Sequence, residues 1–156
     1  MNKNLKVSSD KSMIEEGVML INKGLHLGIH AQEELDDPNR TDDATGIGCY
    51  MLAQSIELLI KGMCFIFGCT PPDHHIIKHS ARLLLNIYNR QIKELYMIQE
   101  GLIDISDNSY AYTIQTWQKL GRYDFLQADQ DDIDKAEVIY NDLKRFILSY
   151  QLNILD

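Results

Sequence analysis

The sequence places a carboxylate and an amine four residues apart within its most apolar stretch. Tyr50 to Phe67 is apolar at most positions, yet it contains Glu57 and Lys61. Side chains four apart share one face of a helix, and Glu before Lys is the favourable order for an ion pair. An ordinary pair of this kind contributes only about 0.3 kcal/mol. In an apolar helix, however, the pair is partly removed from water and is expected to contact further groups.

A second polar candidate is the dipeptide Arg122-Tyr123, which lies between an expected helix and an acidic stretch. Arginine offers a rigid fork of donors for phosphate or carboxylate. Tyrosine offers an aromatic face for stacking and a hydroxyl group. Either the pair contacts a ligand, or Arg122 closes onto Glu57 and ties this loop to the central helix.

The histidines are the remaining candidates for chemistry. His26 and His30 are four residues apart and share a helix face. Helical bundles that bind metals use Glu-x-x-His motifs from paired helices, and this chain contains no such motif. A solvated polar face is therefore preferred there, and no metal site is predicted. His79 follows Pro71-Pro72 and is expected to orient the loop after the prolines or to form a structural hydrogen bond at a helix start.

Familiar catalytic motifs are missing from the chain. It has no Gly-x-Ser-x-Gly, no glycine-rich phosphate loop and no His-Glu-x-x-His. No cofactor is predicted either. The residues by themselves indicate a helical bundle with a possible polar site, and they leave enzymatic activity open with a preference against it.

Long runs of helical periodicity and only three prolines predict an all-α fold. We expect one domain over residues 1–156, an antiparallel up-and-down bundle of four main helices plus one or two short ones. The expected helices cover residues 12–35, 42–67, 77–88, 91–104, 110–120 and 133–154. Ser12-x-x-Glu15 is a capping-box pattern for the first helix. Asp129, Asp131 and Asp132 are expected to cap the last helix rather than to bind metal.

The net charge and the cysteines indicate which binding partners and which cellular compartment to expect. The formal net charge is −8, which opposes sequence-independent binding to a phosphate backbone. The three cysteines form no framework and are expected to be reduced and mostly buried. The first residues do not form a signal peptide, and the apolar stretch is interpreted as a buried helix rather than a membrane span. A cytoplasmic protein is the expectation.

Several of these residues occur in a familiar order. The order Ala53, Glu57, Lys61, Gly68, Pro71, Pro72 and His79, followed by a leucine-rich segment, resembles the HEPN superfamily of nucleotide-binding domains. Members often carry Arg-Tyr-Pro before the last helix, and here Arg122-Tyr123 is followed by Asp124. The resemblance covers about residues 17–150 and implies a helical bundle that is often dimeric.

The resemblance also implies one of two roles. Some members are metal-independent ribonucleases, frequently toxins of toxin–antitoxin pairs or defence effectors, that use an Arg-x(4–6)-His motif. Others lack this motif and bind partners, many of them small nucleotidyltransferases. No arginine of this chain has a histidine at the required spacing. Without an imidazole, this site lacks the obvious general acid or base.

The preferred interpretation is a non-catalytic HEPN-like domain that binds a nucleotide-type ligand, an RNA or a nucleotidyltransferase. The ligand-binding residues would be Glu57, Lys61, His79, Arg122 and Tyr123. One alternative is a ribonuclease with a displaced catalytic set, His79 acting with Arg122. Another is a purely structural dimerisation protein, and all five residues could equally be parts of the scaffold.

Overall fold

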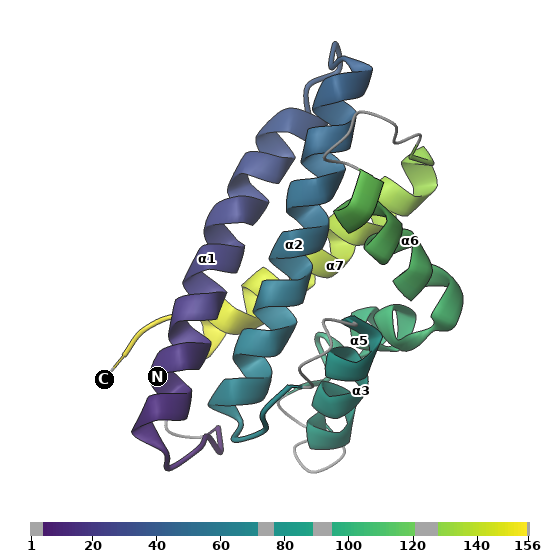
Figure 1. The fold of residues 1–156 in the computed structure, drawn as a ribbon. Helices are drawn as coiled ribbons and strands as arrows, with labels where there is room; N and C mark the ends of the chain where they lie inside the picture. The colour runs from purple at the N-terminus through teal and green to yellow at the C-terminus, as the bar shows by residue number, and fades with distance from the viewer. Residues whose placement is uncertain (1–4, 72–76, 89–94, 121–127, 156) are drawn as a thin grey trace.

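The computed structural model describes residues 5–71, 77–88, 95–120 and 128–155, and all regular structure in these ranges is helical (Figure 1). The helices are α1 (Lys11–Leu35), α2 (Asp42–Ile66), α3 (Ile77–Tyr88), α5 (Gln99–Ser106), α6 (Asn108–Leu120) and α7 (Gln130–Ser149). The all-α prediction is confirmed. Within the described ranges, three long helices, α1, α2 and α7, pack with three shorter ones, α3, α5 and α6, as expected for a helical bundle.

Helices α1 and α2 form a long hairpin whose two arms run in opposite directions (Figure 1). Glycines allow the two backbones to approach closely. A Cβ atom added to Gly17 would lie 2.6 Å from the carbonyl oxygen of Gly62, and one added to Gly48 would lie 2.6 Å from Leu35 Cγ. The small residues therefore determine how near the two helices pack, and α1 packs mainly against α2.

Helix α2 is the centre of the molecule, because it contacts α1, α3, α6 and α7. Its length and composition would allow it to cross a membrane, but 72% of its apolar window is buried inside the fold. The core helix of a soluble protein has the same character. Burial on several sides is also why its polar residues need partners within the protein.

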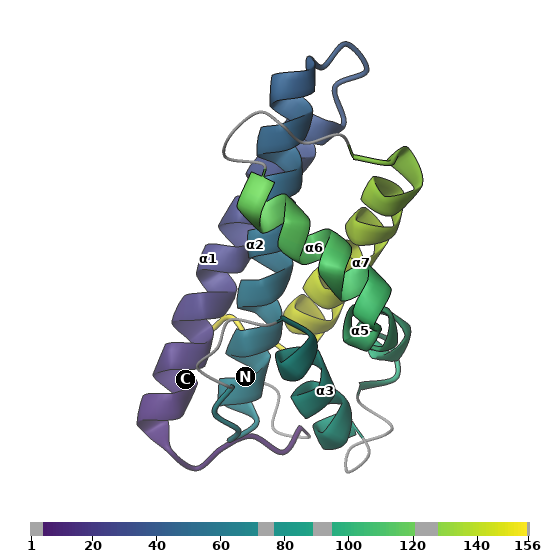
Figure 2. The same ribbon diagram turned by 45° about the vertical axis from the view of Figure 1, so that its right-hand side comes forward.

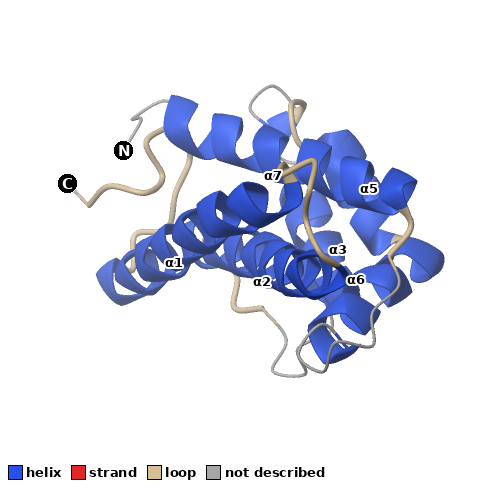
Figure 3. Cartoon of the chain, turned by 90° about the horizontal axis from the view of Figure 1, so that it is seen from above, coloured by secondary structure: helices blue, strands red, loops and turns tan. Residues whose placement is uncertain are grey.

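Helix α7 crosses one face of the α1–α2 hairpin obliquely (Figure 1). The shorter helices α3, α5 and α6 lie on the side of α2 that faces away from α1 (Figures 1 and 3). Figure 2 shows α6 running obliquely from α2 toward α5. Apolar residues recur along α7 at steps of three and four, a pattern that predicts one buried seam, and its members Ile133, Ala136, Tyr140, Leu143 and Ile147 are buried. Its last two expected members lie beyond the helix, where Tyr150 is half-buried and Ile154 is exposed.

The N-terminal cap of α7 agrees with the sequence prediction, whereas the N-terminal cap of α1 differs from it. Asp129 caps α7 by accepting a hydrogen bond from the Asp131 backbone at 2.9 Å, which confirms capping by this acidic segment. The prediction that Ser12 caps α1 as part of a capping box is wrong. Asp10 caps α1 instead and accepts from the backbone N–H of Ser12 at 2.9 Å. A carboxylate at the cap position also interacts favourably with the helix dipole.

The expected helix over 91–104 is interrupted in its described part. A turn covers residues 96–98, and α5 begins only at Gln99. Leu95 before the turn, Ile98 within it and Leu102 after it are all buried. The helical spacing of apolar residues therefore continues across the break, which is why this pattern could not reveal it.

Candidate functional site

Glu57 and Lys61 form a buried ion pair on α2. The Lys61 Nζ lies 2.5 Å from Glu57 Oε1, and the two side chains are 12% and 9% exposed. Glu57 is the one charged residue among the buried residues that the structure describes. The prediction that this pair is at least partly removed from water is confirmed.

A third residue, Gln118 of α6, completes this group by donating its side-chain amide to Glu57 Oε2. The carboxylate thus receives one donor from its own helix and one from a helix 61 residues further along the chain. We call Glu57, Lys61 and Gln118 the α2–α6 polar cluster. It ties the end of α6 to the central helix, four residues before Arg122.

The other predicted ligand-binding residues are His79, Arg122 and Tyr123. His79 lies half-buried in the first turn of α3, and no hydrogen bond or ion pair joins it to Glu57 in the part of the chain that the structure describes. Arg122 and Tyr123 lie outside the described residues. Closure of Arg122 onto Glu57 therefore stays a prediction. Gln118 was missed by sequence reasoning, since a glutamine near a helix end carries no signal of its tertiary partner.

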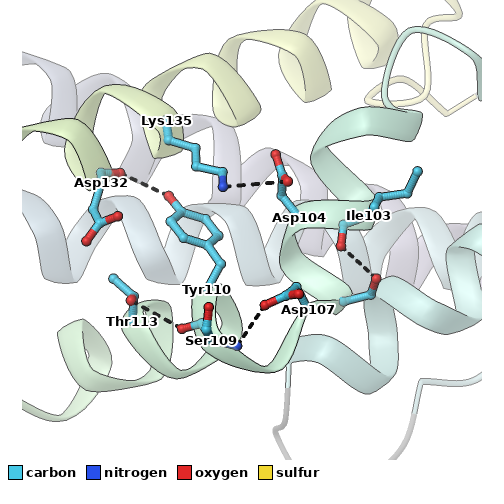
Figure 4. Close-up of polar contacts among 9 residues, drawn as sticks. Ile103, Asp104, Asp107, Ser109, Tyr110, Thr113, Asp132 and Lys135 are labelled. Carbon is cyan, nitrogen blue, oxygen red and sulfur yellow. Dashed lines mark hydrogen bonds and ion pairs between the residues drawn. The ribbon is translucent and has the colours of Figure 1, made fainter.

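A hollow of about 540 Å³ lies between α5, α6 and α7 (Figure 4). Lys135 of α7 lines this hollow, with its Nζ 3.5 Å from Asp104 Oδ1 and 4.5 Å from the centroid of the Tyr110 ring. Tyr110 donates its hydroxyl to the backbone carbonyl of Asp132 at 3.0 Å. A neighbouring hollow of about 410 Å³ shares Asp104 and Lys135.

The groups that line the larger hollow suit binding rather than proton transfer. Burial, followed by the charges of Asp132 and Asp104, raises the pKa of Tyr110, so its phenol remains protonated. Hydrogen bonds from Ser109 lower the pKa of Asp107, so its carboxylate remains ionised. The described residues that line this hollow include no histidine or cysteine. Sequence reasoning treated these segments only as a helix break and a helix cap.

A further polar junction joins the α1–α2 turn to α7. Arg40 donates to Leu35 O at 2.8 Å, to Thr45 Oγ1 at 2.9 Å and to Gln130 Oε1 at 2.6 Å. All three guanidinium nitrogens are thus occupied by neutral oxygen atoms. Arg40 fixes the turn rather than offering a free cation, and sequence reasoning did not identify it.

Beside Arg40, two carboxylates approach each other. Burial, a hydrogen bond with Asp36 and the charges of Asp36 and Asp134 together raise the pKa of Glu137 to about 7. The charge of Arg40 acts in the opposite direction. This junction therefore titrates near neutral pH.

The cysteines are free in the structure, and Cys49 and Cys64 are buried. Burial raises the pKa of each of these two thiols to about 12, so neither is a nucleophile at neutral pH. The prediction of mostly buried thiols is confirmed. Among the described residues, no group of three or more His, Cys, Asp or Glu side chains could surround a metal ion.

No family model matches the chain, and no curated protein or solved structure matches it significantly. The resemblance to HEPN domains therefore depends on the order of its motifs. The α2–α6 polar cluster is the candidate site that contains two of those motif residues, Glu57 and Lys61.

Proposed function

We propose that this protein is a non-catalytic HEPN-like binding module, with its site where the α2–α6 polar cluster meets the segment that follows α6. The observation that carries this proposal is the buried carboxylate of Glu57, which receives donors from both α2 and α6. A buried ion pair is often no more stabilising than apolar residues of similar size. Its presence in the core therefore favours a role in positioning polar groups near the end of α6.

The proposed ligand is a nucleotide or the nucleotide-binding surface of a partner such as a nucleotidyltransferase. Arg122 would contact phosphate, and Tyr123 would stack or pack at the junction. Lys61 would balance the charge of Glu57, and His79 would orient the loop after the prolines. Such a module would act in the cytoplasm, in agreement with thiols that are mostly buried and free.

Thermal unfolding with and without nucleotides tests the ligand-binding part of this proposal. A ligand that binds only the native state at about 100 times its Kd stabilises it by about 2.7 kcal/mol. We expect ATP, GTP or a nucleoside monophosphate to raise the Tm of the wild type and to raise that of Arg122→Ala much less. Arg145→Ala is the matched control, because Arg145 is exposed on α7 and far from this cluster in sequence. An equal rise in Arg122→Ala and the wild type would contradict the assigned site.

We also propose that the protein is a homodimer, as the resemblance implies. Light scattering over a hundredfold range of concentration tests this directly. A mass that stays at 18.0 kDa throughout would contradict it.

A further inference from the structure

Helix α1 carries two histidines whose rings face each other. His26 Nε2 and His30 Nε2 are 3.3 Å apart. The ring centroids are 4.6 Å apart, and the planes meet at 85°. Both residues are exposed. They lie on the side of α1 away from α2, since it is Gly24 that faces Leu59 of α2.

The separation of the two nitrogens matches that of a pair of metal ligands. Imidazole nitrogens bind zinc at about 2.0–2.1 Å, and ligand angles near 90–109° then place two such nitrogens about 2.9–3.4 Å apart. The observed 3.3 Å lies within this interval. One metal ion could therefore replace the proton between the two rings with little movement of either side chain.

Glu33 places a carboxylate beside the His30 ring. Its Oε2 lies 3.4 Å from His30 Nδ1, on the opposite side of the ring from the shared contact. A nearby carboxylate favours the proton on Nδ1 and leaves the Nε2 lone pair available for a metal. Histidines that bind metals commonly have a carboxylate or carbonyl in this position.

We propose that His26 and His30 form a two-point chelate for a late divalent transition metal such as Ni²⁺ or Zn²⁺. Imidazole favours these ions over Mg²⁺ and Ca²⁺, which prefer oxygen ligands. Because no third ligand from the described residues joins the pair, water completes the coordination. Such a site exchanges its metal readily and empties in acid, since a protonated imidazole cannot bind a metal.

This site goes beyond the proposed function and stands apart from it. It uses α1 alone, whereas the α2–α6 polar cluster uses α2 and α6. Loss of metal binding would leave the nucleotide proposal intact, and the reverse also holds.

Untagged protein and Ni²⁺ are the materials for the test. We expect the wild type to be retained on a Ni²⁺-chelate resin at pH 7.5, to elute at pH 5, and to show a Tm raised by NiCl₂. His26→Gln and His30→Gln should each lower the Ni²⁺ affinity at least about tenfold, because one ligand then binds without the other. Glu33→Gln should lower it by about tenfold.

Two control variants distinguish the chelate from the other histidines. The double variant His74→Gln/His75→Gln should bind Ni²⁺ like the wild type. The double variant His30→Gln/Glu34→His keeps the number of histidines but separates the pair by eight residues, about 12 Å along a helix, so it should lose the site. Equal Ni²⁺ affinity in His26→Gln and the wild type, or loss of binding only in the His74/His75 variant, would overturn the proposal. Because both histidines are exposed, these variants should fold, and far-UV circular dichroism verifies it.

Discussion

At the scale of single residues, Glu57 is the one charged side chain in the described part of the core. Glu57 is buried, yet Lys61 and Gln118 supply donors to its two oxygens. The free energy of a buried carboxylate depends on these donors, since removing one partner leaves the others without compensation. The pair is therefore expected to matter more than a surface pair of the same spacing.

Replacing Glu57 alone should destabilise the fold strongly. We expect Glu57→Leu to lower the free energy of unfolding by about 3 kcal/mol, because Lys61 then loses its buried counter-charge. The double variant Glu57→Leu/Lys61→Met should recover much of this loss, because neither charge is left buried. Urea unfolding measures both.

The matched control for this prediction is the exposed pair Lys11–Glu15 on α1. It has the same spacing, but its side chains are 90% and 51% exposed. Glu15→Leu should change the stability by less than about 0.5 kcal/mol. A similar loss in Glu15→Leu and Glu57→Leu would show that burial does not decide the effect.

The sequence allowed part of this site to be predicted. The pairing of Glu57 and Lys61 depends only on helical spacing, which local pattern reveals. The contact with Gln118 depends on how α6 crosses α2, and no local pattern encodes that crossing. The same reason explains why two contacts were not identified, that of Arg40 with Gln130 and that of Glu137 with Asp36, which join residues about 90 and 100 positions apart.

At the scale of elements, close packing of α1 against α2 depends on glycines, and Gly17→Ala tests it. The added Cβ would lie 2.6 Å from the backbone oxygen of Gly62, which cannot move without moving α2. We expect a loss of about 2–3 kcal/mol in the free energy of unfolding.

Gly101→Ala in α5 is the comparison for that prediction. Its added Cβ would lie 3.2 Å from a side-chain carbon of Ile139, which can adjust. The gain in helix propensity, up to about 1 kcal/mol, offsets this contact, so the net change should be small. If Gly17→Ala lowers the free energy of unfolding no more than Gly101→Ala does, α1 and α2 are not packed as closely as described.

The junction between the α1–α2 turn and α7 should make stability depend on pH. The pKa of Glu137 in the folded protein is raised to about 7, from an ordinary value near 4.5. A raised pKa means that the folded state favours the protonated form, so this stabilisation is present at low pH and is lost as the pH rises through 7. We expect the Tm to fall by about 3–6 °C between pH 5.5 and 8.5, after allowance for screening by water.

Glu137→Gln is the control for this pH dependence, because it keeps the shape and the hydrogen bond to Asp36 without a titrating charge. Its Tm should change less over the same interval, and it should exceed that of the wild type at pH 8.5. Parallel curves for the two proteins would assign the pH dependence to other groups.

Most helices could be predicted from sequence, while some of their ends could not. Apolar spacing predicted the buried seam of α7. The turn at residues 96–98 was missed because buried residues keep a helical spacing through it. The cap of α1 was assigned to Ser12 because its spacing to Glu15 fits a capping box, although Asp10 caps the helix.

At the scale of the whole molecule, charge opposes a role that handles nucleic acid without sequence preference. The net charge is −8, and the larger hollow between α5, α6 and α7 holds three aspartates and one lysine. Binding to a phosphate backbone needs a basic surface. A nucleotide bound through one local arginine remains compatible with this charge, because it requires only a small basic site.

The same charge, together with the missing Arg-x(4–6)-His motif, predicts that the protein does not cleave RNA. We expect no cleavage of single-stranded RNA or transfer RNA by the wild type in the presence of a chelator, at low and moderate salt. Arg122→Ala and His79→Ala should behave like the wild type in this assay, since neither residue has a catalytic partner at the required spacing. Metal-independent cleavage by the wild type that disappears in both variants would contradict the binding-module proposal. It would show instead that His79 and Arg122 converge as a displaced catalytic pair, with imidazole as the proton-transfer group and guanidinium stabilising the phosphate.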